Sequence, residues 1–172
     1  SLGLFRWPVQ FEPATPGMLR LGPPTRLSVP GSFHQIACSP NGQVIASPQT
    51  DGALVLHSDR PGHPVRLGPH DNVRSVAVSP GGRFVATGSF TESMVKVWEA
   101  QSGELVKELS LDGGSGVLFS PDGKWLVTLP ARSHSCMIRL WSVGSWRENR
   151  RFLAHGHAAF SSDGKLLAIE KG

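Results

Sequence analysis

Long apolar runs, charged residues and cysteines are all scarce in this sequence of 172 residues. The longest apolar runs are short segments such as Val76-Ala77-Val78, far below the roughly 20 residues of a membrane-spanning helix. We therefore expect no membrane insertion. No basic and then apolar leader opens the chain, so no secretory signal is visible. Charged residues make up 17% of the sequence and apolar residues 39%, a balance that argues against a disordered chain.

The only two cysteines, Cys38 and Cys136, belong to different repeats of the sequence. Segments so placed do not offer the close Cα approach that a disulfide needs. Zinc binding through cysteine pairs is excluded, because neither cysteine has a second one at ligand spacing. We interpret both as small buried residues of a reducing compartment and expect a cytoplasmic location.

Turn-forming residues are abundant, with 20 glycines and 14 prolines, and no stretch has helical periodicity over three or more turns. This composition predicts an all-β protein with many tight turns.

A four-residue turn motif occurs four times, as Ser39-Pro40-Asn41-Gly42, Ser79-Pro80-Gly81-Gly82, Ser120-Pro121-Asp122-Gly123 and Ser161-Ser162-Asp163-Gly164. The first serines of the copies are 40, 41 and 41 positions apart. Serine and proline favour the opening of a type I turn, an Asp or Asn such as Asp122 or Asp163 can bond its own backbone, and glycine accepts the left-handed conformation that closes the loop. Apolar alternation flanks each copy, as a β-hairpin with a buried face requires. The glycines that close the four turns are Gly42, Gly82, Gly123 and Gly164.

A second pattern follows each hairpin at the same period. Val95-Lys96-Val97-Trp98 matches Ile138-Arg139-Leu140-Trp141, and each segment leads through a turn into a further strand. A period near 40 fits one four-stranded antiparallel sheet. Because Lys96 and Arg139 point away from their apolar neighbours, we expect both to reach solvent.

Ser-Pro-Asp-Gly-Lys followed by an apolar strand and then by Ile-Arg-Leu-Trp resembles the WD-repeat β-propeller family, over about Ile36 to Gly172. The resemblance implies an all-β, WD40-like β-propeller of four-stranded antiparallel blades, here a partial propeller. The Trp-Asp dipeptide itself is replaced by Trp98-Glu99 and Trp141-Ser142. The family's hydrogen-bond relay would use His70, Thr87 or Ser89, and Trp98, with Glu92 as a fourth member. Trp7 and Trp141 would hold the same repeat position as Trp98.

We expect one propeller domain that is divided into 1–30 (the end of a preceding blade and a Pro-rich connection), 31–70, 71–110 and 111–154 (three blades), and 155–172 (the first half of a further blade). Gly3–Trp7 would be the third strand of the preceding blade, and Met18–Leu21 its fourth. A chain that begins with Ser1 rather than Met suggests a piece of a ring of six to eight blades, although the two end segments could also complete a four-bladed ring. Uncovered blade edges would favour self-association.

The resemblance implies a non-catalytic scaffold for protein–protein interaction, within a larger regulatory protein similar to bacterial WD repeats attached to serine/threonine kinases. Its partners would bind the loops of one rim. On those loops, which are His70–Arg74, Phe90–Ser93 and Arg132–His134, we predict Arg74, Glu92 and Arg132 as partner-binding residues.

No catalytic, cofactor-binding or metal-binding residues are predicted. Ser115 lies among glycines but lacks the Gly-x-Ser-x-Gly arrangement of a hydrolase, and we interpret its loop as a flexible turn. His155 and His157 are too few to hold a metal.

Two alternatives stay open. Ser-Pro-Asp-Gly hairpins also occur in the sensor or gating propellers of larger enzymes, such as kinases and TolB-like or peptidase proteins. The net charge of +4 and the cluster Trp146–Arg151 indicate a nucleic-acid binder. We interpret this cluster instead as an exposed edge strand on which charge discourages aggregation.

Overall fold

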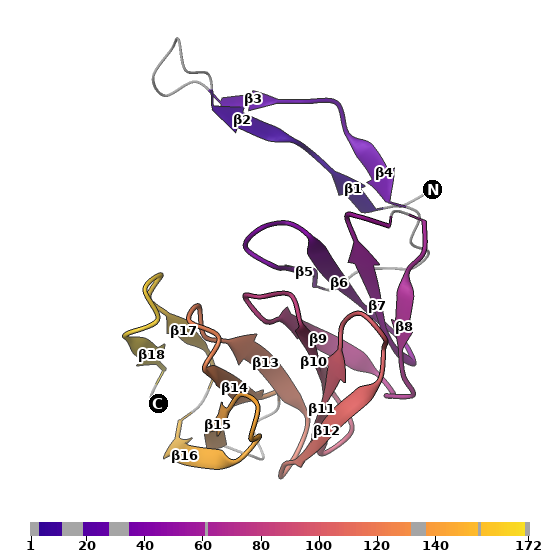
Figure 1. The fold of residues 1–172 in the computed structure, drawn as a ribbon. Coiled ribbons are helices and arrows are strands. Elements are labelled where there is room, and N and C mark those ends of the chain that lie inside the picture. The colour runs from indigo at the N-terminus through magenta and orange to yellow at the C-terminus, as the bar shows by residue number, and fades with distance from the viewer. Residues whose placement is uncertain are drawn as a thin grey trace. The chain divides into compact units, whose positions relative to one another are not determined.

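The computed structural model describes residues 4–11, 19–27, 35–60, 62–131, 137–154 and 156–170, in two compact units, 1–32 and 33–172 (Figure 1). All regular elements in these ranges are β-strands. Among the residues that the structure describes, there is no helix long and apolar enough to cross a membrane.

The second unit contains three four-stranded antiparallel sheets and a final hairpin, and every strand pairs with the next strand in the chain (Figure 1). This arrangement confirms the predicted all-β fold of four-stranded blades. Blade 1 consists of β5 (Ala37–Cys38), β6 (Val44–Gln49), β7 (Gly52–His57) and β8 (Val65–Leu67); blade 2 of β9 (Val73–Val78), β10 (Phe84–Ser89), β11 (Met94–Glu99) and β12 (Leu105–Ser110); blade 3 of β13 (Ser115–Phe119), β14 (Trp125–Pro130), β15 (Met137–Ser142) and β16 (Glu148–Leu153); and the hairpin of β17 (Ala158–Phe160) and β18 (Leu167–Ile169).

Each copy of the turn motif, Ser-Pro-x-Gly in the three blades and Ser161-Ser162-Asp163-Gly164 in the final hairpin, forms the turn between the first two strands of its sheet. In blade 3 the Ser120 hydroxyl donates to Asp122 Oδ1 (2.6 Å), which also accepts from the Lys124 amide (3.1 Å). The Gly123 amide closes the turn on the Ser120 carbonyl (2.9 Å), with a φ of 71° that glycine adopts without strain. The Ser120 hydrogen bond, followed by the Lys124 amide, lowers the pKa of Asp122. The motif therefore fixes the position of every hairpin.

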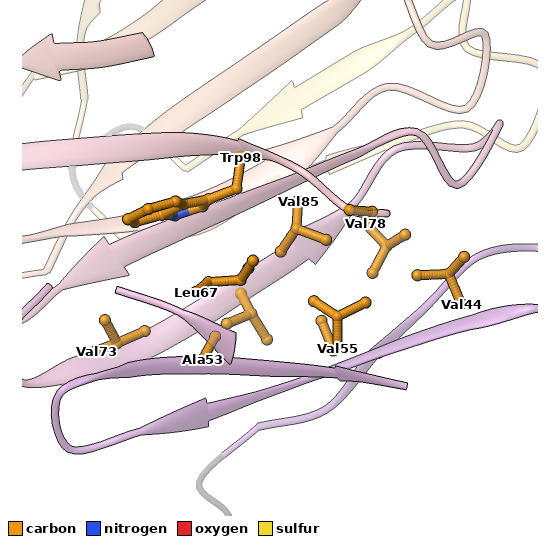
Figure 2. Close-up of a cluster of buried hydrophobic side chains, with 11 residues drawn as sticks. Val44, Ala53, Val55, Leu67, Val73, Val78, Val85 and Trp98 are labelled. Carbon is orange, nitrogen blue, oxygen red and sulfur yellow. The ribbon is translucent and has the colours of Figure 1, made fainter. Parts of the chain in front are cut away.

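The core lies between sheets rather than within one of them. Val44, Val55 and Leu67 of blade 1 pack against Val85 and Trp98 of blade 2, as Figure 2 shows. A second apolar cluster joins blades 2 and 3, and a third joins blade 3 to the β17–β18 hairpin. Because apolar area is removed from water only where two blades meet, each blade is stabilised mainly by its neighbours.

The first strands of neighbouring blades are also linked by polar contacts. The amide of Val76 in β9 donates to Gln35 Oε1 (3.1 Å), and the amide of Val117 in β13 donates to Ser75 Oγ (3.1 Å). These bonds repeat after one period of the sequence and fix the first strands side by side.

The expectation that Lys96 and Arg139 reach solvent is wrong. Their side chains are only 13% and 10% exposed. Lys96 Nζ donates to the Pro69 carbonyl (2.8 Å) and lies 3.5 Å from Glu108, while Arg139 pairs with Asp112 and with Glu148. The groups that cover these two side chains belong to their own blades. Glu108 and Glu148 lie on the fourth strands, and Pro69 and Asp112 lie in the loops that lead into the first strands.

The first unit differs from the expected end of a blade. Leu4–Arg6 (β1) pairs with Thr25–Leu27 (β4), and Val9–Phe11 (β2) pairs with Leu19–Leu21 (β3), so the ribbon has four strands where two were expected. The Gly22 amide donates to the Pro8 carbonyl between the two pairings (2.9 Å). The two predicted strands, which contain β1 and β3, therefore do not pair with each other. Trp7 lies between β1 and β2 and is 52% exposed, unlike the buried Trp98 and Trp141.

Candidate functional site

Three loops meet on one rim of blades 1 and 2: the turn Thr50–Asp51, the loop Gly68–Asn72 that leads into β9, and the turn Phe90–Ser93 between β10 and β11. We call them the rim loops. The Asn72 amide donates to the Thr50 carbonyl (2.7 Å), the Asn72 carbonyl accepts from the Phe90 amide (3.1 Å), and the His70 amide donates to the Asp51 carbonyl (3.2 Å). Asn72 adopts a φ of 51°, which asparagine tolerates better than most residues. The backbone bonds therefore fix the three loops to one another at Asn72.

A buried relay lies beneath the rim loops. Trp98 Nε1 donates to Thr87 Oγ1 (2.8 Å), and His70 Nδ1 lies 2.7 Å from the same oxygen. On the far side of the ring, His70 Nε2 lies 3.5 Å from Glu92 Oε2. The relay thus links the third strand of blade 2 to the loop that leads into its first strand. Of the two candidates for the hydroxyl position, Thr87 occupies it.

Burial determines the charge state of His70. The residue is 1% exposed, and this burial lowers the pKa of its imidazole from 6.5 to about 4. The nearby Glu92 carboxylate raises the pKa, but by less than burial lowers it. The ring is therefore neutral at neutral pH and has one N–H. We place that proton on Nε2, which faces the carboxylate, so that Nδ1 accepts from the Thr87 hydroxyl.

Glu92 and Ser89 close the turn Phe90–Ser93. The amide of Asp71 donates to Glu92 Oε1 (3.2 Å), while the Ser89 hydroxyl donates to the Asp71 carbonyl (2.8 Å) and accepts from the Glu92 amide (2.9 Å). Both oxygens of the Glu92 carboxylate therefore face groups of blade 2. Glu92, predicted both as the fourth member of the relay and as a partner-binding residue, therefore has a structural role.

Arg74 is exposed at the start of β9, next to the rim loops. Its guanidinium carbon lies 4.8 Å from the centre of the Phe90 ring, and its Nε donates to Asn72 Oδ1 (3.3 Å). Arg74 forms no ion pair within the ranges that the structure describes, whereas Arg66 pairs with Asp51 (2.5 Å). Arg74 is thus oriented by its neighbours, and its charge is not neutralised by a carboxylate. Arg132 and the whole segment 132–136, including Cys136, lie outside the described residues.

The relay is complete in blade 2 alone among the described blades. In blade 3, Trp141 Nε1 donates to Thr128 Oγ1 (3.2 Å), but Leu111 stands 41 positions after His70. In blade 1, His57 replaces tryptophan, and its Nε2 lies 2.9 Å from the Ala100 carbonyl of the neighbouring blade. The complete relay therefore lies beneath the rim loops of blade 2.

The predicted basic and aromatic cluster has no exposed aromatic ring. Trp146 is 7% exposed and packs in the core between blades 2 and 3, where no base can stack on it. Glu148 accepts from Arg139 Nη1 (3.0 Å) and from Arg151 Nε (2.6 Å). Sequence reasoning missed the burial of Trp146, because an aromatic residue beside arginines has the same local pattern in both cases.

Other chemically active residues are accounted for by local bonds. Ser115 is buried, and its hydroxyl donates to the Leu129 carbonyl (2.9 Å), so it is part of a strand instead of the flexible turn. Cys38 is exposed, contrary to the expected burial, although partial desolvation of Sγ raises the pKa of the thiol. His155 lies outside the described residues, which contain no group of three possible metal ligands.

One surface hollow, of about 440 Å³, lies away from the rim loops, against the turns Ser58–Asp59 and Gly81–Gly82. Its one arginine is paired, because Arg83 Nε lies 3.8 Å from Glu99 Oε1, and Asp59 adds a second carboxylate to the lining. A second hollow, of about 340 Å³, lies along the first strands and has no charged residue in its lining. Neither offers the oriented, unneutralised charge that Arg74 has.

The model of the family "WD domain, G-beta repeat" matches residues 62–99 and 106–142, which are parts of blades 1 to 3. These two stretches are similar to WD40 repeats. Such repeats generally form non-catalytic modules that bind proteins. No curated protein matches the sequence.

Solved structures agree with the WD40 fold. Hydrazine synthase of Kuenenia stuttgartiensis matches with a TM-score of 0.70 and 20% identity, over 80% of this chain and 41% of that one. The RRP9 WD40 repeats match with a TM-score of 0.61 and 20% identity, over 72% of this chain and 39% of that one. The chain thus spans about two fifths of the length of these two proteins, and the likeness shows the propeller fold alone.

Proposed function

We propose that the chain is a scaffold whose protein partners bind at the rim loops and at Arg74, with Arg132 and Glu92 as further contacts. One observation carries this proposal: three loops from two blades are tied together at Asn72, and the same residue holds the Arg74 side chain. A rigid support lowers the entropy that is lost when a partner binds. Arginine is also among the residues that contribute most to protein interfaces.

The wider setting of the scaffold is part of the proposal. We infer a larger regulatory protein of the cytoplasm, similar to bacterial proteins in which WD repeats accompany a serine/threonine kinase. The WD40 repeats support this, together with the match to only about two fifths of each solved chain. Catalysis, if the larger protein has any, would belong to residues outside this chain.

Protein binding is favoured over nucleic-acid binding. The aromatic residue of the basic cluster is buried, and Arg139 and Arg151 share the Glu148 carboxylate. A nucleic-acid surface needs unneutralised cations and exposed rings together.

The test is capture of proteins from an extract of the source organism on the immobilised 172-residue chain. Arg74→Ala, Arg132→Ala and the double variant should retain the fold and lose the same captured proteins. Glu92 is changed separately, because its loss would also open the turn Phe90–Ser93. Equal capture by all variants would overturn the rim as the binding surface.

Self-association through blade edges is a second, separate proposal. Leu153 at the end of β16 is 72% exposed, and Leu166 before β18 is 71% exposed. An uncovered apolar strand edge readily pairs with another copy. Sedimentation velocity should show a concentration-dependent dimer that Leu153→Lys and Leu166→Lys weaken, and a monomer at all concentrations would contradict it.

A further inference from the structure

We propose that Arg74 is the anchor of the rim and that it binds a single carboxylate, from an Asp or Glu side chain of a protein segment that carries no other charge at the contact. This inference rests on the proposed function and adds the chemistry of the partner. It depends on how the guanidinium is held, on which of its atoms are left for a ligand, and on the charges that surround it.

Two neighbouring residues hold the Arg74 side chain in place. Phe90 supports one face of the guanidinium at 4.8 Å, and Asn72 Oδ1 accepts from Nε at 3.3 Å. These two contacts restrict a long side chain that would otherwise lose much rotamer entropy on binding. Asn72 is itself fixed by the backbone bonds to Thr50 and Phe90, so the orientation of Arg74 is set by the loops of two blades.

The two terminal nitrogens of the Arg74 guanidinium remain available to a ligand. Because Nε is bonded to Asn72, the two terminal nitrogens form the edge that a ligand can reach. This edge matches the two oxygens of a carboxylate in a bidentate pair. The described residues place no carboxylate within ion-pair distance of it.

Arg83 on the opposite rim shows that this arrangement is not general. Its guanidinium carbon also lies 4.8 Å from a ring centre, that of Phe84, and the side chain is 72% exposed. Its Nε, however, lies 3.8 Å from Glu99 Oε1. The two arginines therefore share aromatic stacking and exposure, but only the charge of Arg74 is without a carboxylate partner among the described residues.

The surrounding charges select the class of ligand. Asp71 and Glu92 belong to the same rim loops, and both are carboxylates. Their negative charge repels a phosphate dianion or a nucleic-acid backbone more strongly than a single carboxylate. A protein segment with one Asp or Glu at the contact and no further negative charge beside it fits this field best.

The experiment uses the full 172-residue chain and an array of synthetic eight-residue peptides. Each peptide has one Asp or Glu at its centre in an otherwise uncharged background. Matched peptides replace this residue by Asn or Gln, or by phosphoserine. Wild type, Arg74→Ala, Arg74→Lys and the control Arg83→Ala are compared on every peptide, after circular dichroism has shown that each variant is folded.

We expect a subset of the Asp and Glu peptides to bind wild type and Arg83→Ala equally. Replacement by the amide, or Arg74→Ala, should weaken binding at least tenfold, and Arg74→Lys should restore only part of it because lysine lacks the bidentate edge.

Binding that is the same for the amide peptides or for Arg74→Ala would overturn the inference and leave the proposed scaffold function standing. Tighter Arg74-dependent binding of phosphoserine peptides, or displacement of peptides by a single-stranded oligonucleotide, would overturn the choice of a carboxylate. Binding of no peptide at all would overturn the inference, and absence of rim-dependent protein capture would then overturn the scaffold function as well.

Discussion

The Trp146 ring of blade 3 meets the Phe84 ring of blade 2 edge-on, with centroids 5.2 Å apart and planes at 85°. Trp146 adopts a φ of 53°, in the position where the matching turn of blade 2 has Gly103 with a φ of 79°. Its amide donates to the Ser142 carbonyl (2.8 Å), as the Gly103 amide does to the Glu99 carbonyl. A bulky residue in this left-handed conformation costs about 1–2 kcal/mol, so the contact between blades must offset that cost.

Replacement of Trp146 therefore separates packing from backbone strain. Trp146→Ala should lower the free energy of unfolding by about 3–5 kcal/mol, because a buried tryptophan is lost and the strain is kept. Trp146→Gly should lower it by about 1 kcal/mol less, since glycine accepts this φ without strain. Urea unfolding measures both values. Stability equal to wild type in either variant would show that Trp146 does not join the blades.

The two threonines of the tryptophan contacts provide a matched pair. Thr87 Oγ1 is bonded to both His70 and Trp98, whereas Thr128 Oγ1 is bonded to Trp141 alone. Thr87→Val should cost about 2–3 kcal/mol, because two buried groups lose their partner, and Thr128→Val about 1 kcal/mol. Thermal or urea unfolding of the two variants checks the difference. Equal losses would mean that His70 does not depend on the relay.

His70 should make stability depend on pH. The folded-state pKa is lowered from 6.5 to about 4, so between these values the unfolded chain binds the proton more readily than the folded one. The free energy of unfolding should therefore fall as pH falls from about 6.5 to about 4, by roughly 3 kcal/mol at most from this group. His70→Gln should be less stable at pH 7 but should lose less between those pH values. Parallel curves for the two proteins would contradict the assignment.

The turn of blade 2 can be improved. Gly81 stands where the other turns have Asn41, Asp122 and Asp163, and a Cβ added there meets no atom within 4 Å. Gly81→Asp should stabilise the protein by about 1 kcal/mol through bonds to the Ser79 hydroxyl and the Arg83 amide.

Gly82 is the control for that substitution. Its φ is +71°, and a Cβ would lie 3.0 Å from Val44 Cγ2. Gly82→Ala should therefore destabilise the protein, and the urea midpoints of the two variants should move in opposite directions. A decrease for Gly81→Asp would show that the turn of blade 2 differs from its three copies.

The repeat made the blades predictable. Each copy of the turn motif fixes a hairpin, and the constant period fixes the number of strands between one turn and the next. The His70–Thr87–Trp98 relay also followed from residue types at family positions. The burial of Lys96 and Arg139 did not, because strand alternation tells which face a residue occupies but not whether that face is covered. The pairing of β1 with β4 and of β2 with β3 was also missed, since a short apolar and aromatic segment does not specify its pairing partner.

The orientation of Arg74 depends on tertiary structure as well. Asn72 is near Arg74 in sequence, but the turn that supplies Phe90 is 16 positions away and joins it only in the fold. Sequence reasoning selected Arg74 as an exposed rim residue, and its stacking became visible only with the loops in place.

Site-specific photo-cross-linking tests most directly whether the rim loops bind protein. A benzophenone side chain would replace exposed Thr91 on the rim loops or exposed Gln101 on the opposite rim, and each protein would be irradiated in an extract of the source organism. Thr91 should give a cross-linked protein band that Arg74→Ala weakens, and Gln101 should not give that band. The same band from Gln101, or no protein cross-link from Thr91, would contradict the account.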